Sequence, residues 1–187
     1  MKKFFIAICA ALAAVSASDV HAGENVYFYG VDFSEVKVVG ADETEAEFAK
    51  AFAGINMLLV SEQEKYDFSR AVGSYVIPYP DMMIEQSRTN DYSGMLVYHY
   101  VNPEIDIEGK IQSYRLSQDS GVGMVLIARV LDKPRATATY EAVLFDVATR
   151  EVLQKVQVSS NARGFGLRNY WAGSVYSLTK RKLFKSR

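Results

Sequence analysis

The chain has 187 residues, of which 49% are hydrophobic and 23% are charged, and its formal net charge is −1 at pH 7. This length and composition are typical of one globular domain and exclude a disordered tail, a collagen-like fibre and a disulfide scaffold. The near-neutral charge also excludes nucleic-acid binding by a wholly basic surface.

The first 22 residues have the pattern of a secretory signal peptide. Lys2 and Lys3 form a short basic region, residues 4–15 are an uncharged apolar run, and Val20-His21-Ala22 offers small or β-branched side chains to a signal peptidase. The apolar run is short for a transmembrane anchor. We therefore expect export and cleavage after Ala22, with an uncleaved anchor as the alternative.

Cys9 is the only cysteine of the chain. It follows Ile8, and only five residues separate it from Lys3, which is unlike a lipoprotein attachment site. We interpret it as a residue of the signal core. Residues 23–187, the expected single domain, then contain no cysteine and form no disulfide, so core packing must hold the exported fold together.

The first elements after residue 22 are a strand and an amphipathic helix. Residues 26–33 are rich in aromatic and β-branched side chains and predict a strand, which residues 36–39 extend past a bend. Thr44 and Glu47 have the spacing of a capping box. Apolar residues then recur at three- and four-residue steps, which predicts a helix over 44–59.

The middle of the chain gives weaker patterns. Residues 61–71 are charged, with Tyr66 and Phe68 as expected anchors in the core. Four further segments follow: an irregular or edge segment with two prolines over 76–80, a short element over 81–88, a strand over 95–101 and a short helix over 107–116.

The C-terminal half has clear periodicity. Residues 122–131 form a nearly continuous apolar run that predicts a buried central strand, and two alternating segments follow up to residue 158. Apolar residues at helical spacing over 167–178 predict a terminal helix. We expect an α+β fold: a two-layer sandwich whose mixed, mostly antiparallel sheet ends in a three-strand meander and is covered by an N-terminal and a C-terminal helix.

No catalytic or metal centre is predicted. His99 is the only histidine after Ala22, lies between two tyrosines in an expected strand, and has no cysteine or serine nucleophile motif to activate. One histidine cannot supply a zinc site. Asp81, Asp91 and Asp119 lack the spacing of a calcium loop. We expect a non-enzymatic protein without a cofactor. We interpret Glu104, Asp106 and Glu108 as a solvated turn, with paired carboxylates for glycoside hydrolysis as the alternative.

One segment between the last strand and the last helix is a candidate ligand site. Gly164 and Gly166 are able to expose backbone N–H groups at a helix start, Arg163 and Arg168 add positive charge, and Asn169 follows. This combination favours an anion. The competing interpretation is structural, because glycines also make a tight connection between a strand and a helix.

The chain ends in a basic tail, residues 180–187, with five basic residues and no acidic one. Cations near the end of a helix complement its dipole. The alternative is a weak contact with an anionic membrane, aided by Leu183 and Phe184.

Six segments resemble an uncharacterised family of exported proteins from gut Gram-negative bacteria. They are residues 29–34 (YGVDFS), 54–56 (GIN), 61–67 (SEQEKYD), 138–140 (ATY), 144–146 (LFD) and 163–174 (RGFGLRNYWAGS). The resemblance implies a periplasmic location and brings no established activity.

A looser similarity at the level of the fold is to periplasmic domains of envelope-assembly proteins of the curli-secretion and TolB N-terminal type. The shared features are a strand–helix start, a late hairpin with an Asp146, Thr149, Glu151 turn, and a closing helix. Since similarity of fold does not establish function, it only favours the hypothesis of a protein that binds an envelope partner. We expect binding to an envelope protein or self-association, with an anion- or small-ligand-binding protein as the alternative.

Overall fold

The structure is a computed structural model that describes residues 25–185, so the predicted signal peptide and Cys9 lie outside the described residues. The strands are β1 (Val26–Asp32), β2 (Lys37–Val39), β3 (Val76–Pro78), β4 (Leu96–Val97), β5 (Val122–Asp132), β6 (Thr137–Asp146) and β7 (Val152–Asn161). The helices are α1 (Glu45–Ser61), α2 (Ser69–Val72), α3 (Asp81–Thr89), α4 (Ile107–Ser113) and α5 (Leu167–Thr179).

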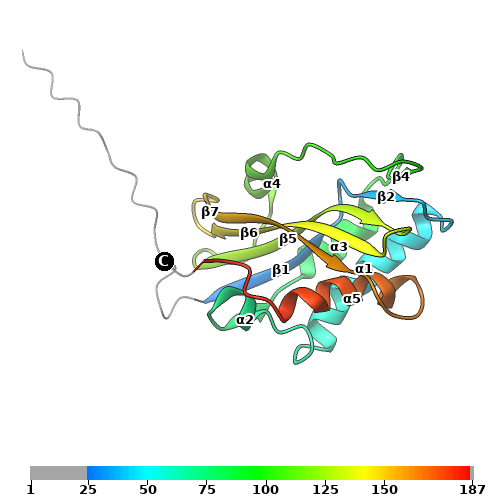
Figure 1. Cartoon of the computed structure of the whole chain (residues 1–187). Coiled ribbons are helices and arrows are strands. Elements are labelled where there is room, and N and C mark those ends of the chain that lie inside the picture. Colours follow the sequence, from blue (N-terminus) through cyan, green and yellow to red (C-terminus); the bar gives the residue numbers. More distant parts are fainter. Residues whose placement is uncertain (1–24, 186–187) are drawn as a thin grey trace, which may run out of the picture.

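All seven strands join one open sheet around β5 (Figure 1). The whole length of β5 pairs with β6 on one side, while β1 pairs with its first half and β2 with its last three residues on the other. Hence β1 and β2 lie end to end along β5. Residues 33–36 separate them, in agreement with the bend that was predicted between the two segments. β3 and β4 pair with the outer sides of β1 and β2.

The expectation of a mostly antiparallel sheet is wrong. Among the described residues, four of the six strand pairings are parallel. The C-terminal meander of β5, β6 and β7 is antiparallel, as predicted. Parallel neighbours need long crossover connections, usually through helices. The segments that carry α1 to α4 supply those crossovers, so the chain returns to the same end before each of β3, β4 and β5.

Both faces of the sheet are covered, although only one covered face was expected. Side chains such as Phe28, Leu126 and Tyr140 pack under α1, α2 and α5 in the larger core. Their neighbours along the strands, such as Tyr29 and Ile127, point the opposite way into a second core beneath α4. In Figure 1 the helices α1 and α5 lie below the sheet and α4 above it.

The sequence patterns of α1 and α5 are confirmed. Thr44 caps α1, its side chain accepting from the Glu47 backbone N–H while the Glu47 carboxylate accepts from the Thr44 N–H at 2.8 Å. On α5, Trp171 is 1% exposed, and Tyr140 of β6 shares a buried 2.7 Å hydrogen bond with Ser174. Tyr66 and Phe68 are both buried, as expected.

A polar cluster around the buried Asp32 fastens α4 to the end of β1. Lys110 Nζ lies 3.2 Å from Asp32 Oδ2 and 2.9 Å from Glu35 Oε1, and it donates to Ser34 Oγ. The Tyr114 hydroxyl donates to Asp32 Oδ2 at 2.7 Å. Burial, followed by the Asp32 charge, raises the pKa of Tyr114 well above its usual value. Because every group here has a partner, we interpret the cluster as structural.

The described part of the basic tail is held against the body. Phe184 is buried in the larger core, Leu183 is half-buried beside it, and the Leu183 N–H donates to the Ala71 carbonyl at 3.0 Å. The two apolar side chains invoked for a membrane contact therefore face the protein. Within residues 25–185, no helix combines the length and apolarity that crossing a membrane requires.

Candidate functional site

Four loops meet at one end of the sheet. They are residues 40–44 after β2, 98–102 after β4, 133–136 after β5 and 162–166 after β7, at the right of Figure 1. Contacts of the 133–136 loop join it to two of the others: Lys133 Nζ donates to Glu43 at 3.0 Å, and the Ala162 N–H donates to Ala136 O at 2.7 Å. The carboxyl end of parallel strands is where open sheets commonly place ligand sites. We call this region the loop end.

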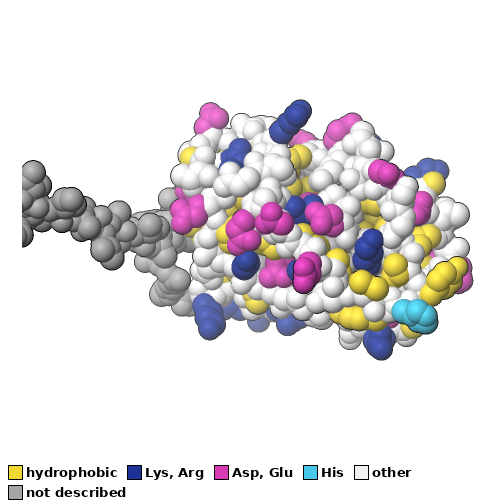
Figure 2. All heavy atoms as spheres, turned by 90° about the horizontal axis from the view of Figure 1, so that it is seen from above, with side chains coloured by type: hydrophobic (Ala, Val, Ile, Leu, Met, Phe, Trp, Pro, Cys, Tyr) yellow, Lys and Arg dark blue, Asp and Glu magenta, His cyan; other side chains and the backbone are white. Residues whose placement is uncertain are grey.

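An exposed aromatic loop, residues 98–101, occupies part of the loop end. It was expected to continue a strand, but β4 stops at Val97 and the chain bends away from the sheet. Tyr98 is 94% exposed and Tyr100 52%, with Val101 and His99 also exposed. Figure 2 shows hydrophobic side chains gathered around His99, the histidine coloured cyan. The guanidinium of Arg135 lies 5.8 Å from the Tyr100 ring centre.

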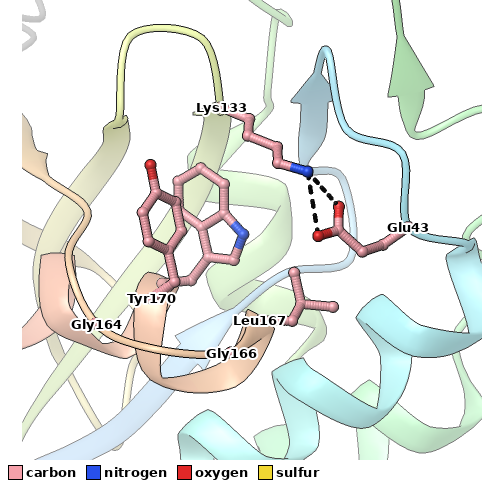
Figure 3. A pocket seen from close by; sticks show the side chains of 7 residues that line it. Glu43, Lys133, Gly164, Gly166, Leu167 and Tyr170 are labelled. Carbon is pink, nitrogen blue, oxygen red and sulfur yellow. Dashed lines mark hydrogen bonds and ion pairs between the residues drawn. The ribbon is translucent and has the colours of Figure 1, made fainter.

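A cavity of about 390 Å³ lies at the loop end, at the start of α5 (Figure 3). Its lining residues come from three loops and one helix: Glu43, Lys133, Gly164, Gly166, Leu167, Tyr170 and Trp171. Lys133 and Glu43 are on one side of the view, Tyr170 is opposite them and Leu167 lies below. The cavity therefore combines an ion pair with an aromatic and aliphatic wall. Its size lies within the usual range for small-ligand sites.

The two glycines of the predicted ligand segment line this cavity. Gly164 and Gly166 both have positive φ, 139° and 77°, where side chains other than glycine are strained. A Cβ at Gly164 would lie 2.5 Å from the Asn169 carbonyl oxygen, whereas a Cβ at Gly166 would meet no atom within 4 Å. Gly164 thus allows the connection to fold against α5, and Gly166 leaves space at the cavity.

The other three residues of that segment do not line the cavity. The Arg163 guanidinium lies 5.8 Å from the ring centre of Tyr176. Arg168 donates from Nε to Asn169 Oδ1 at 3.0 Å, and its stem lies against Gly54 of α1. The structure therefore brings the glycines to the cavity and turns the two arginines towards different neighbours.

The charges at the cavity are already paired with one another. Lys133 Nζ donates to Glu43 at 3.0 and 3.2 Å and lies 3.5 Å from Asp42 Oδ2. The hydrogen bond with Glu43 is the main cause that raises the pKa of Lys133. One ammonium faces two carboxylates, which disfavours a simple anion at this position.

His99 and the acidic residues form no metal site in the described part of the chain. No group of three or more histidine, cysteine or acidic side chains has metal-binding geometry within residues 25–185. His99 lies on the exposed aromatic loop. Asp106 caps α4 by accepting from the Gly109 N–H, and Glu108 binds Lys155 at 2.7 Å.

Glu43 and Lys133 are functional candidates without a local sequence signal. They are 90 positions apart, and each lies in a short polar loop of ordinary composition. Trp171 and Tyr170 both belong to the apolar pattern of the predicted terminal helix, but Trp171 is buried whereas Tyr170 is half-buried at the cavity. The local sequence signal at this place is the pair of glycines, because backbone with positive φ favours a residue without a side chain.

Family models, curated proteins and solved structures were all compared with this chain, and none of the three comparisons gave a match.

Proposed function

We propose that residues 23–187 form an exported, periplasmic, non-enzymatic domain that acts by binding an envelope protein through the aromatic loop. The observation that supports this most directly is the exposure of Tyr98, Tyr100 and Val101, three large apolar side chains within four residues. Tyrosine is enriched at protein interfaces because its ring buries apolar area while its hydroxyl remains hydrogen-bonded.

The surroundings of the loop also favour a protein partner. Arg129, on β5, anchors the following segment by donating to the Pro103 carbonyl at 2.7 Å and lies 3.4 Å from Glu141. The aromatic loop is thus attached at both ends, to β4 and to Arg129. A fixed loop loses less conformational entropy on binding than a free one.

Site-specific photocrosslinking in the periplasm tests this proposal. A photoreactive residue at position 98 or 100 should give one discrete adduct with an envelope protein, and excess wild-type protein should compete it away. Excess Tyr98→Ser/Tyr100→Ser protein should not compete. Tyr75 is the matched control, because it is 74% exposed but lies at the opposite end of the sheet, just before β3.

Two outcomes would contradict the proposal: no adduct from the loop, or equal adducts from positions 75 and 98. An adduct of the protein with itself, together with a dimer in sedimentation experiments that Tyr98→Ser/Tyr100→Ser abolishes, would replace the envelope partner by self-association.

The second candidate is an anion- or small-ligand-binding protein that uses Arg163, Gly164, Gly166, Arg168 and Asn169. The cavity beside the two glycines favours a ligand. The placement of the arginines outside that lining does not favour an anion. If anions bind there, phosphate should raise the melting temperature saturably, and Arg163→Gln/Arg168→Gln should remove the effect. We expect no such rise.

A further inference from the structure

The cavity at the start of α5 has two chemically distinct sides. Lys133 and Glu43 form the polar side, and their side chains are 34% and 30% exposed, so both are within reach of a ligand. Leu167, Tyr170 and Trp171 supply the apolar side. The ring centres of Tyr170 and Trp171 are 4.9 Å apart at an edge-to-face angle of 78°, which fixes the two rings against each other.

The ion pair has unused hydrogen-bonding capacity. An ammonium group has three donors and a carboxylate has about four acceptor positions. Glu43 engages two donors of Lys133 and keeps part of its own acceptor capacity. The third donor has only Asp42 Oδ2 at 3.5 Å, a carboxylate that is 98% exposed and that a ligand carboxylate would replace. A ligand that carries both charges on neighbouring atoms is able to extend this pair: its carboxylate accepts from Lys133 and its ammonium donates to Glu43. Charge-assisted hydrogen bonds of this kind are the strong ones.

We propose that this cavity binds a free α-amino acid with an apolar or aromatic side chain. The α-ammonium and α-carboxylate meet Glu43 and Lys133, and the side chain lies against Leu167 and Tyr170. Gly166 permits close approach, because no side chain lies between its backbone and the cavity. This inference does not depend on the proposed protein partner, which uses the aromatic loop.

Ligands with one charge fit the site less well. An anion would gain Lys133 but lie near the carboxylates of Glu43 and Asp42, the latter 3.5 Å from the same ammonium. A cation would gain Glu43 and Asp42 but would lie near the Lys133 ammonium and offer it no acceptor. A zwitterion places an opposite charge against each partner, so it uses both sides of the ion pair.

The protein contains a built-in reporter for the test, since Trp171 is the only tryptophan of the chain and borders the cavity. Its fluorescence should change saturably when L-phenylalanine or L-leucine is added to the purified exported protein. N-acetyl-L-phenylalanine, which lacks the ammonium, and L-phenylalanine methyl ester, which lacks the carboxylate, should each bind at least about tenfold more weakly.

Variants give a second, independent arm. Glu43→Gln and Lys133→Met should each weaken binding of the free amino acids by about tenfold or more. The matched control is the ion pair of Lys155 and Glu108, at 2.7 Å and remote from the cavity, so Lys155→Met should bind as the wild type does. Circular dichroism and the melting temperature show whether each variant is folded. The experiment with the acetylated and esterified compounds uses only the wild-type protein, so it does not depend on whether the variants fold.

The proposal is overturned if neither amino acid gives a saturable change up to the limit of solubility. It is also overturned if the acetylated and esterified compounds bind as well as phenylalanine, or if phosphate or a simple alkylamine binds equally well. Crosslinking at the aromatic loop is a separate measurement, so failure here leaves the proposed partner surface standing.

Discussion

Replacing Lys110 by methionine should destabilise the protein far more than removing an exposed lysine. Lys110 is 11% exposed and its ammonium lies 3.2 Å from the Asp32 carboxylate, whose side chain is completely buried. Removing one partner of a buried pair leaves a charge without compensation, at a cost of about 3–5 kcal/mol. Asp32 would still accept from the Tyr114 hydroxyl and the Ser34 N–H, so we expect about 3 kcal/mol.

Urea unfolding at pH 7 measures this change. Lys110→Met should lower the midpoint at an unchanged slope, and adding Asp32→Asn should recover at least about 1 kcal/mol, because the buried charge is then gone. The control is Lys65→Met, which breaks a 2.7 Å pair with Glu62 whose side chains are 48% and 41% exposed, and should cost less than about 1 kcal/mol. Equal effects of Lys110→Met and Lys65→Met would refute the reasoning.

The remaining predictions concern other parts of the chain. Trp171→Ala should cost about 3–5 kcal/mol in urea unfolding, because the side chain is buried; an unchanged midpoint would contradict this. Thr44→Ala should cost about 1 kcal/mol by removing the α1 cap, and Thr44→Ser should restore most of it. Burial raises the pKa of both Tyr114 and Tyr140, so above pH 10 the unfolded state binds fewer protons than the folded state. The free energy of unfolding should therefore fall as pH rises beyond about 10, by about 1.4 kcal/mol per pH unit for each tyrosine. The fall should be less steep in Tyr140→Phe, and an unchanged slope in that variant would show that Tyr140 does not cause it. N-terminal sequencing of the exported protein should begin at Gly23, and a retained first segment would disprove cleavage.

Elements with strong local signals could be predicted from the sequence. The capping box at Thr44 and the apolar stripe placed α1 within two residues at its C-terminal end. The apolar run of β5 predicted the central strand because a strand buried on both faces needs no alternation. The 146–151 turn also formed as expected: the Thr149 N–H donates to Asp146 Oδ1 at 2.7 Å.

Features that depend on distant pairing could not be predicted in the same way. Val26 of β1 pairs with Val122 of β5, and no local pattern specifies whether such partners run parallel. The aromatic residues of 98–101 have high strand propensity, but propensity does not distinguish a ladder from an exposed loop. The polar side of the cavity could not be predicted for the same reason, because Glu43 and Lys133 meet only after the sheet has formed.

The position of β5 determines when the sheet can assemble. β1, β2 and β6 all pair with β5, which begins only at Val122. A chain that is synthesised from the N-terminus therefore lacks the central strand until about two thirds of its residues have been made. Before that point, α1 has no complete sheet surface to pack on. Such non-local assembly is slow relative to helix formation. For a protein threaded through a membrane, as we propose for this one, that delay would keep the chain in a translocatable state until its last third follows.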